Sequence, residues 1–195
     1  MIMGAPRHCH SCHQGWREEP GRLDVAVYSA VAATPTPVLD RCFRDLSRAA
    51  DRSKLWLGSA AALVVCGGQP GRRAAANGLA SIAVTSATVN VLLKPLAHRR
   101  RPDRRAHDVP AGREVEMPRS RSFPSGHAAS AFAFATGVEI ALPRIGVPLT
   151  ATAALVAYSR VHTGVHYPGD AIAGSVIGAG VAPIVVAALD RRRRV

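Results

Sequence analysis

Long apolar runs separated by arginine-rich breaks are the feature that most constrains the fold of this chain. Two runs of 19 residues, 75–93 and 171–189, contain no charged residue. A helix that crosses the hydrocarbon core of a bilayer needs about 20 mostly apolar residues, so both runs are long enough to span it. A soluble helical bundle with buried central helices is the alternative, and the two charge-free runs argue against it.

Three shorter apolar runs, 55–68, 127–142 and 145–158, need flanking residues or a thinner bilayer to cross. They are rich in Ala, Gly, Ser and Thr, which suits close helix packing in lipid. We therefore expect an all-α fold, a polytopic transmembrane bundle with five to six membrane helices. Residues 23–33 are the candidate for a sixth, partial crossing, and residues 39–56 have the charge pattern of an interfacial helix.

The predicted organisation has four parts. These are a disordered N-terminus (1–22), interfacial or amphipathic helices (23–54), a membrane-embedded domain (55–190) and a basic tail (191–195). Cys9 and Cys12 lie in HCHSCH, which has zinc-ligand residue types at C-x-x-C spacing. No second pair of ligands follows nearby, so we expect neither a metal nor another cofactor.

The net charge of +12 favours an anionic partner such as nucleic acid, anionic lipid or a phosphorylated substrate. Nucleic acid is the weakest of these, because no binding motif is present and aromatic residues make up only 5% of the chain. We expect the bilayer and a lipid-linked phosphate as partners, and a multi-pass location in the plasma membrane. Arginines divide almost evenly between the two sides, so the positive-inside rule does not orient the chain.

Polar clusters at three helix boundaries reach the same membrane face if each run crosses once. Residues 94–101 follow the second run, and residues 124–127 precede the third across a single loop. Residues 160–170 come two crossings later and return to that face. Counting crossings therefore predicts one site at one face. The candidate residues are Lys94, Arg101, Ser125, Gly126, His127, Arg160, His166 and Asp170.

The residue types in these clusters suit phosphate binding. Three cations, Lys94, Arg101 and Arg160, require an anion, and a guanidinium fork matches phosphate oxygens. Ser125 occupies the N-cap position of an apolar helix, which leaves outward-pointing backbone N–H groups around Gly126. We expect these N–H groups to cradle a phosphate.

Two histidines complete the predicted chemistry. Asp170 follows His166 by four residues, so its carboxylate can fix one imidazole nitrogen and leave the other as a nucleophile. His127 can then protonate the leaving oxygen as a general acid. The cations stabilise the charge on the phosphoryl oxygens, which is most of what phosphoryl transfer requires.

The segments KPLAHRRRP (94–102), PSGH (124–127) and SRVHTGVHYPGD (159–170) resemble the signatures of the type 2 phosphatidic acid phosphatase superfamily. Those signatures are K-x6-RP, PSGH and SR-x5-H-x3-D, and each matches here at every named position. The resemblance covers about residues 75–189. The chain is similar in particular to bacterial members of this family that act on polyprenyl-linked phosphates, among them the decaprenyl-phosphoryl-ribose 5-phosphate phosphatases.

The resemblance implies an all-helical, metal-independent enzyme that hydrolyses a polyprenyl-type or glycerolipid phosphate monoester or diphosphate. It implies that His166 forms a phosphohistidine, that Asp170 orients it and that His127 is the general acid. The three cations named above, with Ser125 and Gly126, are then the phosphate ligands.

Two other classes of function remain open at this stage. Vanadium-dependent haloperoxidases share the anion site but are soluble and larger. A non-enzymatic protein that binds anionic lipid through residues 94–121 is the other. Among the remaining arginines of that loop, Arg99, Arg100, Arg104 and Arg105 are expected to face solvent or lipid, and Arg119 and Arg121 are weaker candidates for substrate contact.

Overall fold

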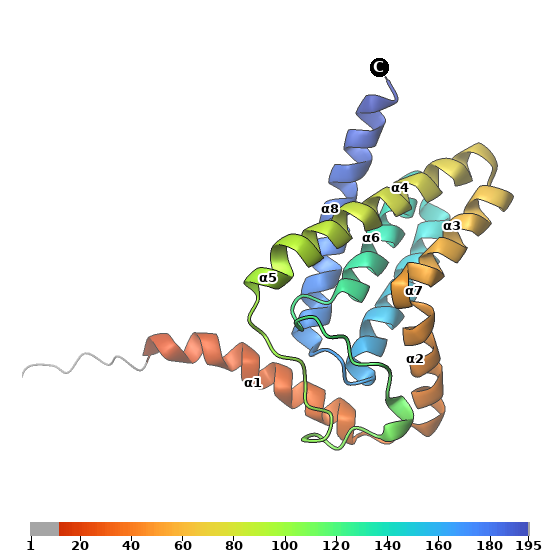
Figure 1. Ribbon diagram of the computed structural model, residues 1–195. Helices are drawn as coiled ribbons and strands as arrows, with labels where there is room; N and C mark the ends of the chain where they lie inside the picture. Colours follow the sequence, from red (N-terminus) through yellow and green to blue (C-terminus); the bar gives the residue numbers. More distant parts are fainter. Residues whose placement is uncertain (1–11, 195) are drawn as a thin grey trace, which may run out of the picture.

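The computed structural model describes the backbone of residues 12–194 and the side chains of residues 21–194, and this part of the chain is helical without strands. The α-helices are α1 Cys12–Ala33, α2 Pro37–Ala49, α3 Lys54–Cys66, α4 Gly68–Ala87, α5 Lys94–Leu96, α6 Gly126–Ala141, α7 Pro143–His162 and α8 Pro168–Arg192 (Figure 1). Two 3-10 turns, η1 Asp51–Ser53 and η3 Ala111–Arg113, and a π-helix, η2 Thr88–Leu93, complete the described elements. The all-α prediction is confirmed.

Helix α6 is the centre of the bundle. It packs against α4, α7 and α8, and α3 packs on the outer side of α4 (Figure 1). Most of α6 is buried, and most of its buried residues are small, including Ala128, Ala131 and Ala135. A helix that is apolar all round is stable only when neighbours cover it, so α6 is fixed on several sides. Its first turn is therefore held firmly at one end of the bundle.

Two glycines bring α8 into backbone contact with α6. A Cβ on Gly174 would lie 2.4 Å from the carbonyl oxygen of Ser125, and one on Gly178 would lie 2.1 Å from that of Ala129. The spacing G-x-x-x-G is typical of closely packed membrane helices. The start of α8, which carries the third polar cluster, is thus placed beside the start of α6, which carries the second.

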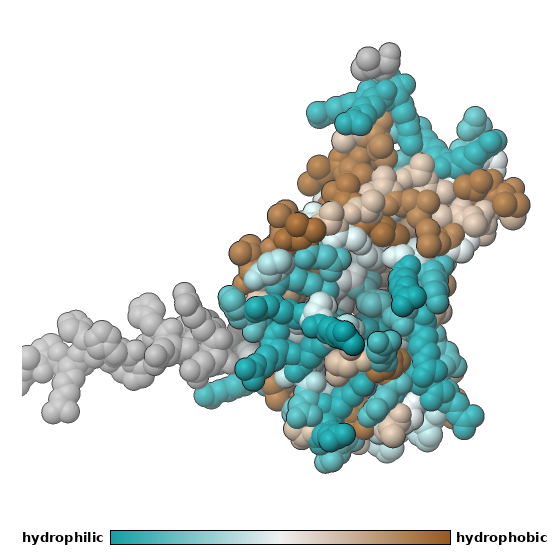
Figure 2. All heavy atoms as spheres, viewed as in Figure 1, coloured by the Kyte–Doolittle hydropathy of each residue, from teal (hydrophilic) through white to brown (hydrophobic). Residues whose placement is uncertain are grey.

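Only two described helices, Gly68–Leu96 and Pro168–Arg192, are both long and apolar enough to cross a membrane. By length and hydropathy alone, the described helices therefore do not meet the prediction of five to six membrane helices. Helix α3 has 13 residues and α6 has 16, and the bundle covers much of α6. In Figure 2, hydrophobic residues gather over α4, α5 and α8, and hydrophilic residues gather at the two ends.

The N-terminal segments differ from the prediction. Helix α1 begins at Cys12, so residues 12–22 are helical where disorder was expected, and residues 1–11, with Cys9, lie outside the described residues. The single helix expected over 39–56 is interrupted at η1. There Arg52 and Ser53 have left-handed backbones with φ of 53° and 59°. This break turns the chain from α2 into α3.

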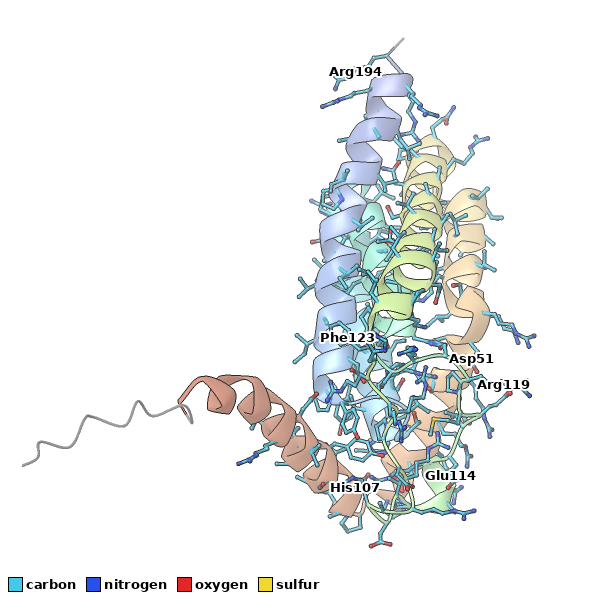
Figure 3. The ribbon with its side chains drawn as sticks, turned by 60° about the vertical axis from the view of Figure 1, so that its left-hand side comes forward. Asp51, His107, Glu114, Arg119, Phe123 and Arg194 are labelled. Carbon is cyan, nitrogen blue, oxygen red and sulfur yellow. The ribbon has the colours of Figure 1, made fainter. Side chains whose placement is uncertain are left out.

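The long loop 97–125 lies at one end of the bundle. Asp51, His107, Glu114, Arg119 and Phe123 lie toward this end in Figure 3, whereas Arg194 lies at the other. The arrangement agrees with the predicted count of crossings, because the helix boundaries at residues 94, 126, 162 and 168 share the loop end.

Candidate active site

A pocket of about 210 Å³ brings the three predicted clusters together. Five of the eight predicted residues line it, and they are Lys94, Arg101, Gly126, His127 and His166. The other three, Ser125, Arg160 and Asp170, are buried beside it. The backbone N–H of Ser125 donates to the carbonyl oxygen of Asp170 at 2.9 Å, so the second and third clusters are joined directly.

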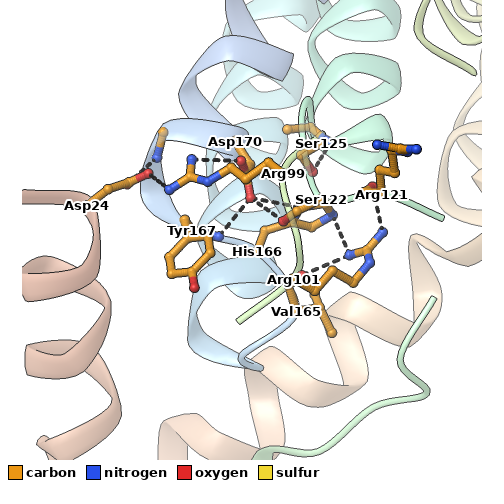
Figure 4. Close-up of polar contacts among 12 residues, drawn as sticks. Asp24, Arg99, Arg101, Arg121, Ser122, Ser125, Val165, His166, Tyr167 and Asp170 are labelled. Atoms are coloured by element: carbon orange, nitrogen blue, oxygen red, sulfur yellow. Dashed lines mark hydrogen bonds and ion pairs between the residues drawn. The ribbon is translucent and has the colours of Figure 1, made fainter. Parts of the chain in front are cut away.

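His166 is oriented from both sides of its ring. Its Nδ1 lies 3.4 Å from Oδ2 of Asp170, and its Nε2 lies 3.1 Å from Nη1 of Arg101 (Figure 4). A donor at Nδ1 leaves the Nε2 lone pair directed toward the pocket, where an Arg101 N–H meets it. This is the tautomer that nucleophilic attack through Nε2 requires.

Asp170 is fixed by further donors. It is the third residue of α8, and its Oδ2 accepts from the N–H of Tyr167 at 3.0 Å and from the hydroxyl of Ser122. A carboxylate at this position also complements the positive end of the helix dipole. The local fold of α8 therefore holds Asp170 against His166.

Burial lowers the pKa of His166 to about 4, and the charge of Arg101 adds to this effect, while Asp170 opposes it. Burial also lowers the pKa of Arg101, although Asp170 opposes this. His166 is thus a neutral imidazole at physiological pH, as a nucleophile must be.

His127 is paired with a carboxylate that the sequence analysis did not single out. Its Nε2 donates to Oδ1 of Asp51 at 2.9 Å, and the same oxygen lies 3.6 Å from Nη1 of Arg160. The hydrogen bond from His127 is the main reason that the pKa of Asp51 lies below its ordinary value. Asp51 is the residue at which α2 and α3 are separated, and nothing in the local sequence pattern predicts that break.

Arg160 is a buried guanidinium whose hydrogen-bond donors are only partly satisfied. Its side chain is 1% exposed, Nη1 donates to the hydroxyl of Ser47, and Nε has no hydrogen-bond partner among the described residues. An unpaired buried donor is unfavourable, so this nitrogen is poised for an acceptor supplied by a ligand.

The start of α6 has the local geometry expected of a phosphate cradle. Ser125 is the N-cap of α6, as predicted, and its hydroxyl oxygen accepts from the N–H of Ala128. A Cβ on Gly126 would lie 3.5 Å from Nζ of Lys94, so the missing side chain keeps the space between helix terminus and ammonium open. Lys94 is the first residue of α5, directly after η2, and its Nζ donates to the Ser120 hydroxyl at 3.2 Å.

The structure does not support the expectations for two of the loop arginines, Arg99 and Arg121. Arg99 does not simply face solvent or lipid, because its Nη1 donates to Oδ1 of Asp170 at 3.0 Å. Arg121 donates to the carbonyl oxygen of Ala97 at 3.0 Å and does not line the pocket. Neither contact follows from periodicity, since this loop has no repeating pattern.

Comparisons with known proteins agree with the geometry. A family model described as the PAP2 superfamily matches residues 74–194. The decaprenylphosphoryl-5-phosphoribose phosphatase of Mycobacterium tuberculosis is 34% identical over 183 residues, which cover 91% of this chain and 97% of that protein. A lipid A 1-phosphatase of Rhizobium johnstonii is 43% identical over 58 residues, which cover 30% of this chain and 24% of that protein.

Two crystal structures share the fold. Aquifex aeolicus LpxE matches with a TM-score of 0.68 and 24% identity, over 84% of this chain and 94% of that one. The first transmembrane PAP2 type phosphatidylglycerolphosphate phosphatase from Bacillus subtilis matches with a TM-score of 0.65 and 23% identity, over 89% of this chain and 87% of that one.

Proposed function

The chain belongs to the PAP2 superfamily and is a phosphatase of that family, and we propose that it removes the phosphomonoester group from a polyprenyl-phosphoryl sugar. The family resemblance inferred from the three motifs is confirmed, and the non-enzymatic alternative is set aside. The substrate class is supported by the decaprenylphosphoryl-5-phosphoribose phosphatase of Mycobacterium tuberculosis, because the match covers 91% of this chain and 97% of that protein.

The observation that carries the proposal is one pocket that holds a neutral imidazole, a second histidine and several cations. His166 and His127 line the pocket together with Lys94 and Arg101, and Arg160 lies beside it with an unsatisfied Nε. Positive charge and N–H donors placed around a transferring phosphoryl group stabilise its oxygens.

The proposed reaction has two steps. In the first, Nε2 of His166 attacks phosphorus, an N–P bond forms, the P–O bond to the sugar breaks, and His127 gives its proton to the leaving oxygen. In the second, water attacks the phosphohistidine, the N–P bond breaks, and His127 takes up the proton of that water. Inorganic phosphate leaves, and both histidines return to their starting states.

We further propose that α3, α4 with η2 and α5, α6, α7 and α8 cross the plasma membrane, with the pocket at one face. Large hydrophobic side chains exposed on these helices support this placement, among them Val65, Val91, Ile145, Leu155 and Ile184. Exposed apolar residues on so many helices suit contact with lipid rather than water. Residues 23–54 would then lie at the membrane surface, and the basic residues that follow α8 at the opposite face.

The test is phosphate release from decaprenylphosphoryl-5-phosphoribose by detergent-solubilised protein in EDTA. We expect turnover without added metal, and a protein-bound phosphate that is stable in base and lost in acid. His166→Ala should lower kcat by at least about 1,000-fold, whereas the exposed His98→Ala should remain active. Full turnover by His166→Ala, or loss of all activity in EDTA, would overturn the proposal.

A further inference from the structure

Helix α1 is linked to His166 through Arg99 and Asp170. Arg99 donates from Nη1 to Oδ1 of Asp170 at 3.0 Å, and its Nη2 forms an ion pair with Oδ2 of Asp24 on α1 (Figure 4). The other oxygen of Asp24 accepts from the N–H of Gly169 at 2.7 Å. Asp24 therefore contacts both Arg99 and the backbone beside Asp170. It also lies outside residues 74–194, which the family model matches.

The two oxygens of Asp170 have different partners. Oδ2 accepts hydrogen bonds from the ring of His166, the hydroxyl of Ser122 and the N–H of Tyr167. Among the described residues, Arg99 is the donor to Oδ1. Asp170 is completely buried, so an unpaired carboxylate oxygen would be strongly unfavourable. Arg99 thereby fixes the rotation of the carboxylate whose other oxygen orients His166.

Arginine suits this position better than lysine would. The guanidinium carbon lies 4.3 Å from the centre of the Tyr167 ring, and its two terminal nitrogens contact two different carboxylates. A planar fork stacked on an aromatic ring holds this geometry, and a single ammonium group does not.

Charge gives Asp24 a separate role. The negative charge of Asp170 supports the imidazolium character that His166 gains when it is phosphorylated. Arg99 alone would offset that negative charge. Asp24 balances Arg99, so the chain Asp24–Arg99–Asp170 keeps a net charge of about −1 beside His166. Among the described residues, Arg101, at 3.1 Å, and Arg160 also act on the charge of His166, and Lys94 and His127 line the same pocket.

We propose that Asp24 and Arg99 are positioning residues for phosphoryl transfer, and that α1 is part of the active site through them. This proposal rests on the proposed function for its catalytic consequence. It assigns a role to a helix outside the matched family region and to an arginine outside the three motifs.

A titration that does not depend on turnover tests the coupling. The His166 ring is followed by nitrogen NMR in detergent micelles, with Arg99→Gln, Asp24→Asn and two controls, Arg100→Gln and Asp45→Asn. Arg99→Gln should raise the pKa of His166 and Asp24→Asn should lower it, because they remove charges of opposite sign. The control positions are exposed and should leave it unchanged. Equal pKa values in all four variants would overturn the proposal.

Kinetics then separate positioning from general destabilisation. Both variants should lose about 10- to 100-fold in kcat with little change in KM, as expected when a reacting group is misplaced. Asp24→Glu, which keeps the charge, should recover part of the loss. Loss of kcat without any shift in the His166 titration would indicate a merely structural role and contradict the proposal. An inactive wild type with the expected titration shifts would instead count against the proposed function.

Discussion

His166 is a buried imidazole whose surroundings disfavour its charged form. The ring is 1% exposed, and burial is the largest cause of a pKa of about 4, with Arg101 as a further cause. An ordinary histidine in an unfolded chain has a pKa near 6.5. Between these two values the unfolded chain binds a proton that the folded chain does not, so His166 contributes stability that is lost as the pH falls from 6.5 toward 4.

The pH dependence of kcat/KM should show this shift directly. Because kcat/KM reports the ionisation of the free enzyme and of the free substrate, the acidic limb that belongs to His166 should lie near pH 4, separate from that of the substrate phosphate, whose second pKa is about 6. Rates measured from pH 4 to pH 7, with protein stability checked at each pH, test this. An enzyme limb near pH 6.5, distinct from the ionisation of the substrate phosphate, would contradict the environment described for His166.

Asp51 lies beside two of the residues proposed to act on the substrate phosphate. Its Oδ1 contacts both Nε2 of His127 and the guanidinium of Arg160. A carboxylate at this point repels a phosphate, which carries the same sign of charge. Asp51→Asn should therefore tighten inhibition by inorganic phosphate about fivefold, equivalent to about 1 kcal/mol. The inhibition constant measures this, with Asp45→Asn as the control, and weaker inhibition would show that Asp51 supports phosphate binding instead.

At the level of helices, the apolar runs predicted most elements but not their ends. The run 75–93 corresponds to α4 with η2, and the run 145–158 to α7, which extends over 143–162. The helices continue into polar residues because those residues find partners at the bundle end, and hydropathy does not register such partners. The break at Arg52 and Ser53 has no glycine or proline to mark it, so Asp51 and its contact with His127 could not be predicted.

Some residues of the candidate site could be placed from the sequence, and others could not. Motif spacing and the count of crossings were enough to bring His166, His127 and Lys94 to one pocket. The contact between Arg99 and Asp170 depends on how loop 97–125 folds across the bundle, and that loop has no periodicity from which its path follows. Long-range contacts of irregular segments are set by tertiary packing rather than by local pattern.

The close approach of α8 to α6 makes a prediction about two neighbouring glycines. Gly178→Ala would place a Cβ 2.1 Å from the carbonyl oxygen of Ala129, whereas a Cβ on Gly180 meets nothing within 4 Å. We expect Gly178→Ala to destabilise the protein by about 1–3 kcal/mol, which corresponds to a fall in Tm of roughly 3–10 °C. Gly180→Ala is the matched control. Thermal unfolding in detergent measures both, and equal Tm values would show that the helices do not pack this closely.

For the whole molecule, the two ends of the bundle differ in what they carry. The pocket, α1, α2 and loop 97–125 lie toward one end, and Arg194 lies at the other (Figure 3). Helix α3 begins beside η1 at the pocket end and ends at Cys66. If the bundle spans the membrane as proposed, the residues of α2 and the end of α3 face opposite compartments.

Two exposed cysteines allow this arrangement to be tested. Cys42 lies on α2 and Cys66 is the last residue of α3. In single-cysteine variants with Cys9 and Cys12 replaced by Ser, a membrane-impermeant maleimide added to intact cells should label only one of the two positions. The other should react only after the membrane is permeabilised. Arg193→Cys in a cysteine-free background is the internal control, because it follows α8 and should behave like Cys66. Labelling of Cys42 and Cys66 from the same side would contradict a spanning α3 and would place the pocket end and the far end of that helix in one compartment.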